Sequence, residues 1–390
     1  MLSHKINSLT ESLTIAITTK AKKMISDGFN VISLSAGEPD FDTPRKIKEA
    51  TIAAIEGNKG GKYTPVPGSF ELLEAICEKL KRDNNLTYTP NQVMSNVGAK
   101  HSLFNVFQCI LNEGDEVIIG APFWVTYPEI VKFSGGKPVI IYTKAADKFK
   151  LTAEQIKAAI TPRTRAIVLN SPSNPCGGVY SRSELEEIDK VLHGTQILVV
   201  SDEIYEKLDF SGEFVATAAV SEEMFHRTIT INGLSKCGAM PGWRFGYTAC
   251  ANGELNAAMR KLQSQSTSNI ASIVQAGAIV ALKGEIEDDI AAMKEEFKKR
   301  RNFAVEAINA IDGLSVVKPD GAFYLFVDCH KIETDSIAFC SALLERALVA
   351  CVPGVGFGMD GFFRLSYACD MDSLRRGIER IADFVKSYKK

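Results

Sequence analysis

The stretch NGLSKCGAMPGWRFG, residues 232–246, holds one lysine, Lys236, among small and apolar residues. The β-branched run Thr228–Ile231 leads into it and predicts a buried strand. One interpretation is that the strand delivers the lysine to a crowded pocket, where desolvation would lower the pKa of its amine. The neutral amine can then attack a carbonyl carbon. Ser235 and Arg244 lie on either side of this lysine in the chain and are suited to binding an anion.

The ordinary alternative is a solvent-exposed lysine in a glycine-rich loop, because most lysines are exposed. The pattern G-L-S-K-x-x-A-M-x-G-W-R-F-G nevertheless resembles the pyridoxal-phosphate lysine motif of the class I and II aminotransferases, and every restricted position of that motif is filled. In that family the lysine binds the cofactor aldehyde covalently, and the serine and arginine hold the cofactor phosphate. The resemblance implies these roles for Lys236, Ser235 and Arg244. It extends from about Ser12 to beyond Arg364.

Composition excludes several other classes of protein. The chain is 45% hydrophobic and 24% charged, as globular proteins are, and its net charge of −2 argues against nucleic acid or an anionic membrane as a partner. Its nine cysteines show no CxxC pair and no metal-ligand spacing, which favours reduced thiols in the cytoplasm. The first 20 residues lack the apolar core of a signal peptide. Residues 269–282 are too few to span a bilayer and predict a buried helix.

Between about residues 92 and 248, short apolar runs alternate with helical patterns. Continuous Val/Ile runs separated by helices indicate a mostly parallel sheet that is covered on both faces. The predicted strands are Glu116–Ile119, Pro138–Tyr142, Ala166–Leu169, Ile197–Val200 and Thr228–Ile231.

The flanking regions predict further helices and short strands. Helices are expected at 11–30, Ile47–Glu56, Phe70–Asp83, Ile286–Ile311, 335–348 and 371–388. Strands are expected at Val31–Leu34, Ala322–Val327 and Phe362–Ser366, and loops at 35–44 and 57–69.

A chain of 390 residues is too long for one core and predicts two domains, with a boundary near residue 284. The resemblance implies fold type I of the pyridoxal-phosphate transferases, an α/β fold. It places a mostly parallel seven-stranded sheet in a large domain, 45–284. A smaller α+β domain would combine 285–390 with the N-terminal segment, 1–44.

Polar residues follow three of the predicted strands. Asn174 follows Ala166–Leu169, and Asp202 and Tyr205 follow Ile197–Val200. Ligands of open α/β sheets bind beyond the carboxyl ends of the strands, so these residues and the lysine loop are expected to meet over one crevice. A carboxylate can keep a pyridine nitrogen protonated, and Asn and Tyr can donate hydrogen bonds to a phenolate oxygen.

Each of these residues also has an ordinary structural explanation. Asp202 can cap a helix, and Asn174 can be a turn residue before Pro175. The joint pattern with the lysine motif favours cofactor binding, and the family places Asn, Asp and Tyr at these positions in these roles. Asn174 is also expected to contact the substrate.

SNVGAKHSLFN, residues 95–105, predicts a turn that opens a helix, and the free N–H groups of a helix start bind phosphate. The resemblance implies that Gly98, Ala99 and Lys100 line the phosphate site. It also implies that Trp124, in APFWVTY, stacks on the cofactor ring next to the substrate; a core tryptophan is the alternative. Tyr63, in GKYTPVPG, matches a tyrosine that reaches the phosphate of the neighbouring subunit, which implies a homodimer with shared active sites.

The substrate α-carboxylate needs a partner, and a guanidinium suits it. Arg364, in FFRLSYA, matches the family's arginine for this carboxylate, although an edge-strand surface arginine is the alternative. Gly37, in SAGEPD, matches a glycine whose backbone N–H supports the same carboxylate.

The chain most resembles the bacterial aspartate aminotransferases of subgroup I-gamma. This implies that an amino acid displaces Lys236, that the freed lysine removes the α-proton, and that Asp202 keeps the ring nitrogen protonated, with Tyr205 beside the reacting centre. A 2-oxo acid leaves, and a second half-reaction passes the amino group to another 2-oxo acid, 2-oxoglutarate when aspartate is the donor. A β-lyase of the same fold remains an alternative, because fold does not determine reaction.

Two non-enzymatic alternatives are less consistent with the sequence. A cofactor-sensing regulator carries an added DNA-binding domain, and motifs that begin near residue 12 are expected to leave no room for one. A nucleotide-binding module is opposed by the missing glycine fingerprint.

An acidic substrate needs a second cationic or donor group. QSQSTSNIAS, residues 263–272, aligns with the region that supplies an arginine in the more familiar subgroup, and it has no basic residue. In the I-gamma enzymes a lysine after the phosphate glycine takes this role with a serine and a threonine, which implies Lys100, Ser12 and Thr14. Alternatively, Lys100 serves only the phosphate. The same pocket can admit prephenate, whose ring carries a carboxylate.

Overall fold

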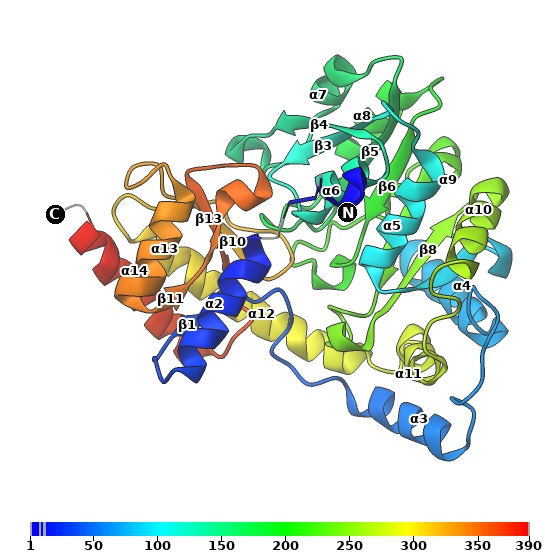
Figure 1. Cartoon of the computed structure of the whole chain (residues 1–390), viewed down its shortest axis with the longest axis horizontal. Coiled ribbons are helices and arrows are strands. Elements are labelled where there is room, and N and C mark those ends of the chain that lie inside the picture. The colour runs from blue at the N-terminus through cyan, green and yellow to red at the C-terminus, as the bar shows by residue number, and fades with distance from the viewer. Residues whose placement is uncertain (1, 8, 11–12, 389–390) are drawn as a thin grey trace.

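The computed structural model describes residues 2–7, 9–10 and 13–388 of the chain (Figure 1). Its helices are α1 His4–Asn7, α2 Leu13–Ser26, α3 Arg45–Glu56, α4 Phe70–Asn84, α5 Ala99–Ile110, α6 Thr126–Phe133, α7 Ala153–Ala159, α8 Arg182–Leu192, α9 Glu222–Arg227, α10 Gly253–Ser264, α11 Ser272–Leu282, α12 Glu287–Asn309, α13 Ser336–Ala347 and α14 Met371–Tyr388. Its strands are β1 Ile32–Ser33, β2 Val93–Val97, β3 Glu116–Ala121, β4 Lys137–Tyr142, β5 Thr164–Asn170, β6 Leu198–Asp202, β7 Thr228–Gly233, β8 Phe245–Cys250, β9 Ser315–Val316, β10 Tyr324–Asp328, β11 Val349–Ala350, β12 Val352–Pro353 and β13 Phe362–Ser366.

Within the described residues, seven strands form the large sheet in the order β2-β8-β7-β6-β5-β3-β4. β8 alone among them runs antiparallel to its neighbours, β2 and β7, and the other pairings are parallel. The predicted α/β fold with a mostly parallel sheet is therefore confirmed. Each of the five predicted strands is present with bounds that differ by a few residues. The sequence patterns did not single out β2 and β8.

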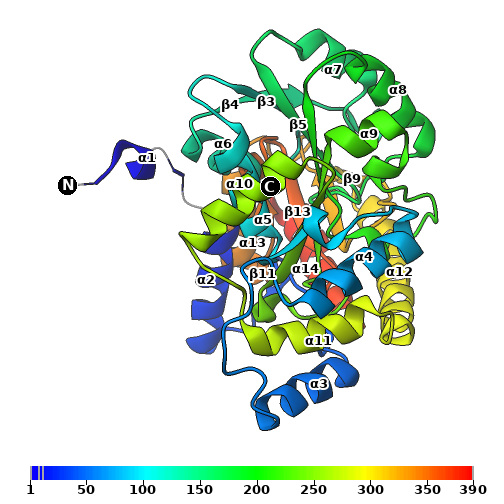
Figure 2. The ribbon, with the colours of Figure 1, turned by 90° about the vertical axis from the view of Figure 1, so that its right-hand side faces the viewer.

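Helices cover both faces of the large sheet. On one face, α5, α6 and α10 pack against apolar side chains of β3, β5, β6 and β7. On the other face, α7, α8 and α9 cover the half near β3 and β5, and α4 and α11 cover the half near β2 and β8 (Figures 1 and 2). Because both faces are buried, the strands are continuous apolar runs rather than alternating ones.

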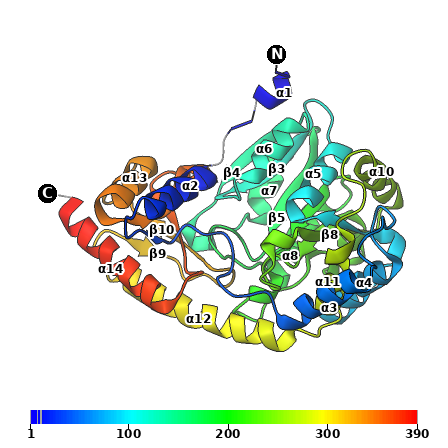
Figure 3. The same cartoon turned by 60° about the horizontal axis from the view of Figure 1, so that its bottom comes forward.

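A second sheet of four strands, in the order β12-β13-β10-β9, lies within the C-terminal part of the described chain and is antiparallel. The helices α12 and α14 pack against it and run along one side of the molecule (Figure 3). β1 pairs with β11. In Figure 1 the blue helix α2, from the N-terminal segment, lies beside the orange helix α13, from the C-terminal region. These contacts support joining the N-terminal segment to the C-terminal region. The limits 1–44, 45–284 and 285–390 stay predictions.

Two predicted elements begin or end at residues with left-handed backbone. The helix expected at 11–30 ends at Ser26, and Gly28 just beyond it has a φ of 92°, a conformation that commonly ends helices. The strand expected from Ala322 begins at Tyr324, because Ala322 has a φ of 59°, which is incompatible with an extended strand. Among the described helices, none is both long and apolar enough to cross a membrane.

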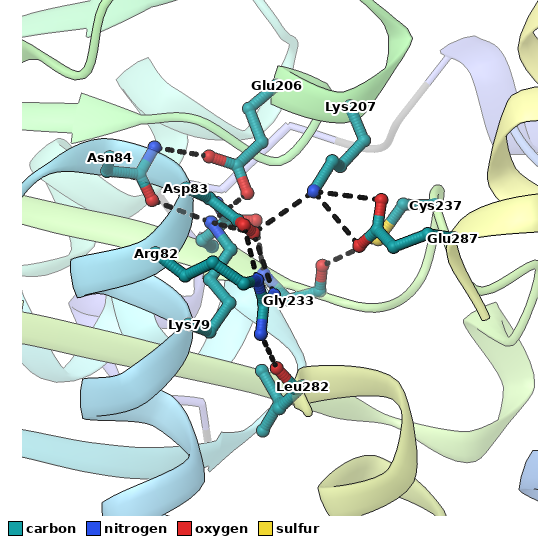
Figure 4. Close-up of polar contacts among 11 residues, drawn as sticks. Lys79, Arg82, Asp83, Asn84, Glu206, Lys207, Gly233, Cys237, Leu282 and Glu287 are labelled. Atoms are coloured by element: carbon teal, nitrogen blue, oxygen red, sulfur yellow. Dashed lines mark hydrogen bonds and ion pairs between the residues drawn. The ribbon is translucent and has the colours of Figure 1, made fainter. Parts of the chain in front are cut away.

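A buried ion pair anchors the turn that follows β6 (Figure 4). Lys79, on α4, is 5% exposed and contacts the carboxylate of Glu206, which is 9% exposed. Asn84 closes the group, since its Oδ1 accepts from Lys79 Nζ at 2.8 Å and its Nδ2 donates to Glu206 Oε2 at 2.9 Å. Glu206 directly follows Tyr205 in the chain. The group therefore ties α4 to the segment that carries the polar residues at the end of β6.

More exposed charges extend this group toward α12. Asp83 Oδ2 lies 3.0 Å from Lys207 Nζ, and Lys207 also pairs with Glu287 at 3.1 Å, at the first residue of α12 (Figure 4). Arg82 Nε donates to Asp83 Oδ1 at 2.7 Å, and its Nη1 donates to the Leu282 carbonyl at 3.0 Å. One polar cluster thus joins α4, α11, α12 and the turn after β6.

Replacing Lys79 by methionine should destabilise the protein strongly. The substitution leaves the buried Glu206 carboxylate without its cation, and such a loss costs about 3–5 kcal/mol. Urea unfolding followed by circular dichroism measures it. Lys190→Met is the matched control, because Lys190 pairs with Glu187 on an exposed face and should contribute only about 0–1 kcal/mol. Adding Glu206→Leu to Lys79→Met should recover much of the loss. Equal stability of Lys79→Met and the control would contradict this account.

Candidate active site

The described residues enclose a cavity of about 310 Å³ at the carboxyl ends of β5, β6 and β7, beside the start of α5. Most of the residues singled out in the sequence line it. They are Gly37, Ala99, Lys100, Trp124, Asn174, Asp202, Tyr205, Ser235, Lys236, Arg244 and Arg364. The parallel strands end at the same edge of the sheet, so residues far apart in the chain meet here.

Lys236 reaches the cavity from the loop after β7, and its Nζ donates to the Gly37 carbonyl at 2.5 Å. Nζ also lies 5.6 Å from the centre of the Tyr205 ring. Burial, and after it the nearby cation of Arg364, lower the pKa of Lys236 to about 8, against the opposing effect of the acidic groups Glu38 and Asp202. A substantial fraction of this amine is neutral near pH 8, as a nucleophile or a general base requires.

Asp202, the last residue of β6, is 3% exposed. Its Oδ2 accepts a hydrogen bond from Tyr127 Oη at 2.7 Å, and its Oδ1 accepts one from the Ile204 backbone N–H at 3.2 Å. Burial raises its pKa to about 6, while the bonds from Tyr127 and Ile204 and the charge of Lys236 act in the opposite direction. The carboxylate is therefore the ionised form at neutral pH, and it can hold a protonated ring nitrogen.

The part of the cavity beside the start of α5 is suited to an anion. Helix α5 begins at Ala99, where backbone N–H groups are free to bind a phosphate. Gly98 precedes it with a φ of 77°, and a Cβ there would lie 2.5 Å from Arg244 Nη2. Only glycine lets the guanidinium approach the helix start so closely. Ser235 and Lys100 also line this cavity, and burial and then Arg244 lower the pKa of Lys100.

Arg364 enters the cavity from β13, in the second sheet, and is 2% exposed. Its Nη1 donates to Asn174 Oδ1 at 3.1 Å and its Nη2 to the Ser35 carbonyl at 2.9 Å, while its Nε has no hydrogen-bond partner among the described residues. In the described part of the chain, no carboxylate pairs with it. A buried guanidinium without an anion is unfavourable, so the site favours a ligand that supplies a carboxylate.

Some predicted residues lie elsewhere. Tyr63 is 90% exposed, in the loop before α4, and does not line the cavity. Ser12 lies outside the described residues. Thr14 belongs to α2, and its side chain is not among those described. Gly98 sits behind Ala99 and shapes the anion end without lining the cavity.

The sequence patterns missed several lining residues, among them Tyr127, Asn170 and Tyr324. Tyr127 lies three positions after Trp124, and the two rings meet edge to face with centres 5.5 Å apart. Asn170 ends β5, so its position at a strand end was an available signal. Tyr324 lies in the apolar strand β10, where an aromatic residue is ordinary, and nothing in the local sequence marks it.

These residues fit pyridoxal phosphate. The cavity volume of about 310 Å³ lies at the lower end of the range for ligand sites, roughly 300–1,000 Å³. The amine of Lys236 can bind an aldehyde, and Asp202 can face a ring nitrogen. Gly98 lets the Arg244 guanidinium lie beside the start of α5, because a Cβ at this position would collide with it. The guanidinium and the helix start together can bind a phosphate.

Comparison with known proteins agrees with this assignment. Residues 30–381 match the family model "Aminotransferase class I and II". The chain is 48% identical to an aspartate aminotransferase of Bacillus sp. (strain YM-2), with 99% of both chains covered. It is 43% identical to an aspartate/prephenate aminotransferase of Nitrosomonas europaea, covering 98% of this chain and 99% of that one.

The fold matches a solved structure of Thermus thermophilus aspartate aminotransferase with maleate. The TM-score is 0.94 at 41% identity, over 98% of this chain and 99% of that one. With the family model and close relatives over nearly the whole length, the chain belongs to the class I and II aminotransferases, pyridoxal-phosphate-dependent enzymes whose substrates are amino acids and 2-oxo acids.

Proposed function

We propose that the enzyme transfers the amino group of aspartate to 2-oxoglutarate, in two half-reactions that share one site. The observation that carries the proposal is that two further cations, Arg364 and Lys100, line the cavity that Lys236 enters. Arg364 lacks an anion, and Lys100 lines the same cavity. Aspartate and 2-oxoglutarate each carry two carboxylates, so both cations gain a partner. The names of the relatives and the dicarboxylate maleate in the Thermus structure support the same substrate class.

In this proposal, each residue has a defined task. Pyridoxal phosphate, when bound, supplies an aldehyde that takes up the amino group and an electron-withdrawing ring. Lys236 would hold the cofactor covalently at rest, and once freed its amine would take the proton from the substrate Cα at Nζ. Asp202 holds the proton at the ring nitrogen, and Tyr205 and Asn174 donate to the phenolate oxygen. Trp124 stacks on the ring.

The anion-binding groups divide between cofactor and substrate. Gly98, Ala99, Ser235 and Arg244 hold the phosphate at the start of α5, as the free N–H groups and the guanidinium favour. Arg364 binds the substrate α-carboxylate, supported by the backbone N–H of Gly37.

We assign the second carboxylate of the substrate to Lys100, acting with Ser12 and Thr14. The Lys100 Nζ lies 5.0 Å from the centre of the Trp124 ring, and both residues line the cavity.

Prephenate is a second candidate substrate. Lys100 also lines an adjoining cavity of about 690 Å³ among the described residues, with walls such as Phe104, Phe123 and Ile140. This space can admit a ring that carries a carboxylate. The relative from Nitrosomonas europaea is named for both activities.

We further propose a homodimer in the cytoplasm. Apolar side chains are exposed along α3, in the loop after it and at the start of α4: Ile52 is 52% exposed, Ile55 57%, Tyr63 90% and Phe70 66%. Such a patch favours an interface, and a second copy would bring its Tyr63 to the site. All nine cysteines are free, which suits a reducing compartment.

Reductive trapping should place the cofactor on Lys236. Apoprotein mixed with pyridoxal phosphate and borohydride should carry the label on the Lys236 peptide, identified by mass spectrometry. Because the neutral amine reacts and its pKa is about 8 rather than 10.5, the trapping rate should rise about tenfold per pH unit and level off near pH 8. Lys236→Ala, the control, should bind the cofactor reversibly and lose transamination. A rate still climbing at pH 10 would refute the assigned pKa.

Mixed dimers should test the shared site. Tyr63→Ala and Lys236→Ala should each be inactive or nearly so alone. When the two are mixed and refolded, each mixed dimer holds one site with both native residues, so part of the activity should return. Subunit exchange is verified with differently tagged chains. Proven exchange without recovered activity would exclude a Tyr63 contribution across the interface.

Replacing Lys100 by alanine should lower kcat/KM for aspartate by about tenfold to a hundredfold, because a charge-assisted contact to a carboxylate contributes roughly 1.5–3 kcal/mol. Steady-state kinetics with alanine as the donor is the control, since alanine has no second carboxylate to lose. Equal losses for the two donors would show that Lys100 serves the cofactor phosphate alone.

A further inference from the structure

We infer that Tyr324 is a positioning residue that acts on both halves of the site, directing the hydroxyl of Tyr205 through its own hydroxyl and orienting Arg364 through its ring. This inference rests on the proposed function, which assigns Tyr205 to the cofactor and Arg364 to the substrate. Tyr324 lines the cavity although it is fully buried, and it comes from the second sheet rather than from the large one.

The sheet register explains why Tyr324 meets Arg364. The strands β10 and β13 lie side by side (Figure 1). They are antiparallel, with Tyr324 opposite Ser366 and Phe326 opposite Arg364. Residues two apart on a strand share a face, so the Tyr324 and Arg364 side chains are diagonal neighbours within reach of long side chains. The guanidinium carbon lies 4.4 Å from the centre of the Tyr324 ring and 5.1 Å from that of Phe357.

This ring contact matters because Arg364 has few other restraints. Among the residues that the structure describes, its polar contacts are those to Asn174 and the Ser35 carbonyl, and its Nε has no partner there. A cation over an aromatic face gains about 0.5–2 kcal/mol. The Tyr324 ring therefore holds the guanidinium in one plane, ready for a two-point contact with a carboxylate.

The hydroxyl of Tyr324 acts on the other half of the site. It lies 2.8 Å from the hydroxyl of Tyr205, and the two rings meet edge to face with centres 5.9 Å apart. In the described part of the chain, Tyr324 Oη has no other hydrogen-bond partner. When Tyr205 donates its proton to a bound ligand, its oxygen must be the acceptor in the hydrogen bond with Tyr324, and Tyr324 must be the donor. Tyr324 thus sets the direction of the Tyr205 proton and, by polarising Tyr205, strengthens it as a donor.

Two substitutions separate the two effects. Tyr324→Phe removes the hydroxyl and keeps the ring, whereas Tyr324→Leu removes both. Tyr367→Phe is the matched control, because Tyr367 is a fully buried tyrosine near the same sheet whose hydroxyl donates to the Ala322 carbonyl at 3.1 Å, and it does not line the cavity. Tyr205→Phe and Arg364→Lys serve as reference variants. Should Tyr324→Leu fold poorly, Tyr324→Met tests the same ring contact.

Two readouts on the cofactor-loaded enzyme measure the effects without turnover. The first readout is the pKa of the bound cofactor, measured from its absorbance as a function of pH. It reports on Tyr205, because a hydrogen bond donated to the cofactor's phenolate oxygen favours the ionised form of that oxygen. Tyr324→Phe should raise this pKa, by less than Tyr205→Phe does, and leave the Kd for maleate within about twofold. Tyr324→Leu should also raise the Kd for maleate by about twofold to thirtyfold, the range expected for the loss of a cation–π contact. In steady state, Tyr324→Phe should lower kcat, and Tyr324→Leu should also raise KM.

The inference is overturned if Tyr324→Phe titrates like the Tyr367→Phe control, or if Tyr324→Leu binds maleate as tightly as the wild type. It is also overturned, together with the proposed roles of Tyr205 and Arg364, if the two reference variants leave both readouts unchanged. If the reference variants change the cofactor pKa and the Kd for maleate while the Tyr324 variants change neither, the inference alone fails and the proposed roles of Tyr205 and Arg364 stand.

Discussion

The site depends on keeping the Lys236 amine buried. Removing an amine from water disfavours its charged form, and the cations of Arg364 and Arg244 add to this effect. The protein offsets the burial with the Gly37 carbonyl, which accepts from Nζ at 2.5 Å, and with the nearby charge of Asp202. Gly37 and Lys236 are 199 residues apart in the chain. The N-terminal segment that carries Gly37 must therefore pack against the edge of the large sheet for the Lys236 amine to have this hydrogen-bond acceptor.

The charges around the cavity are unequal. Lys100, Lys236, Arg244 and Arg364 line it, and Asp202 is the one carboxylate among the lining residues. An excess of buried positive charge is unfavourable in the protein by itself, but it attracts anionic ligands into a site of low dielectric. Burial is the main cause of the lowered pKa of Lys236 and Lys100, and the excess of positive charge adds to it. The same excess suits the site to a phosphate and two carboxylates.

Rigid surroundings hold these groups in place. The Lys79–Glu206–Asn84 group fixes the turn after β6 from behind, and Tyr324 contacts Tyr205 from the second sheet. The two supports come from different parts of the fold, so the hydroxyl of Tyr205 is held between the large sheet and the small one. A site assembled from two sheets in this way keeps its geometry only if both sheets pack correctly.

The sequence alone determined the α/β class and five of the central strands, because apolar periodicity is a local signal. It also marked Asn174 and Asp202, which follow predicted strands. The resemblance carried by the motif around Lys236 implied most of the other cavity-lining residues, among them Arg364. The tertiary structure alone decided the antiparallel course of β8, the contact of Tyr127 with Asp202 and the place of Tyr324. The physical reason is that a buried tyrosine in a strand looks like any core residue until strand register and sheet packing bring its hydroxyl within 2.8 Å of another.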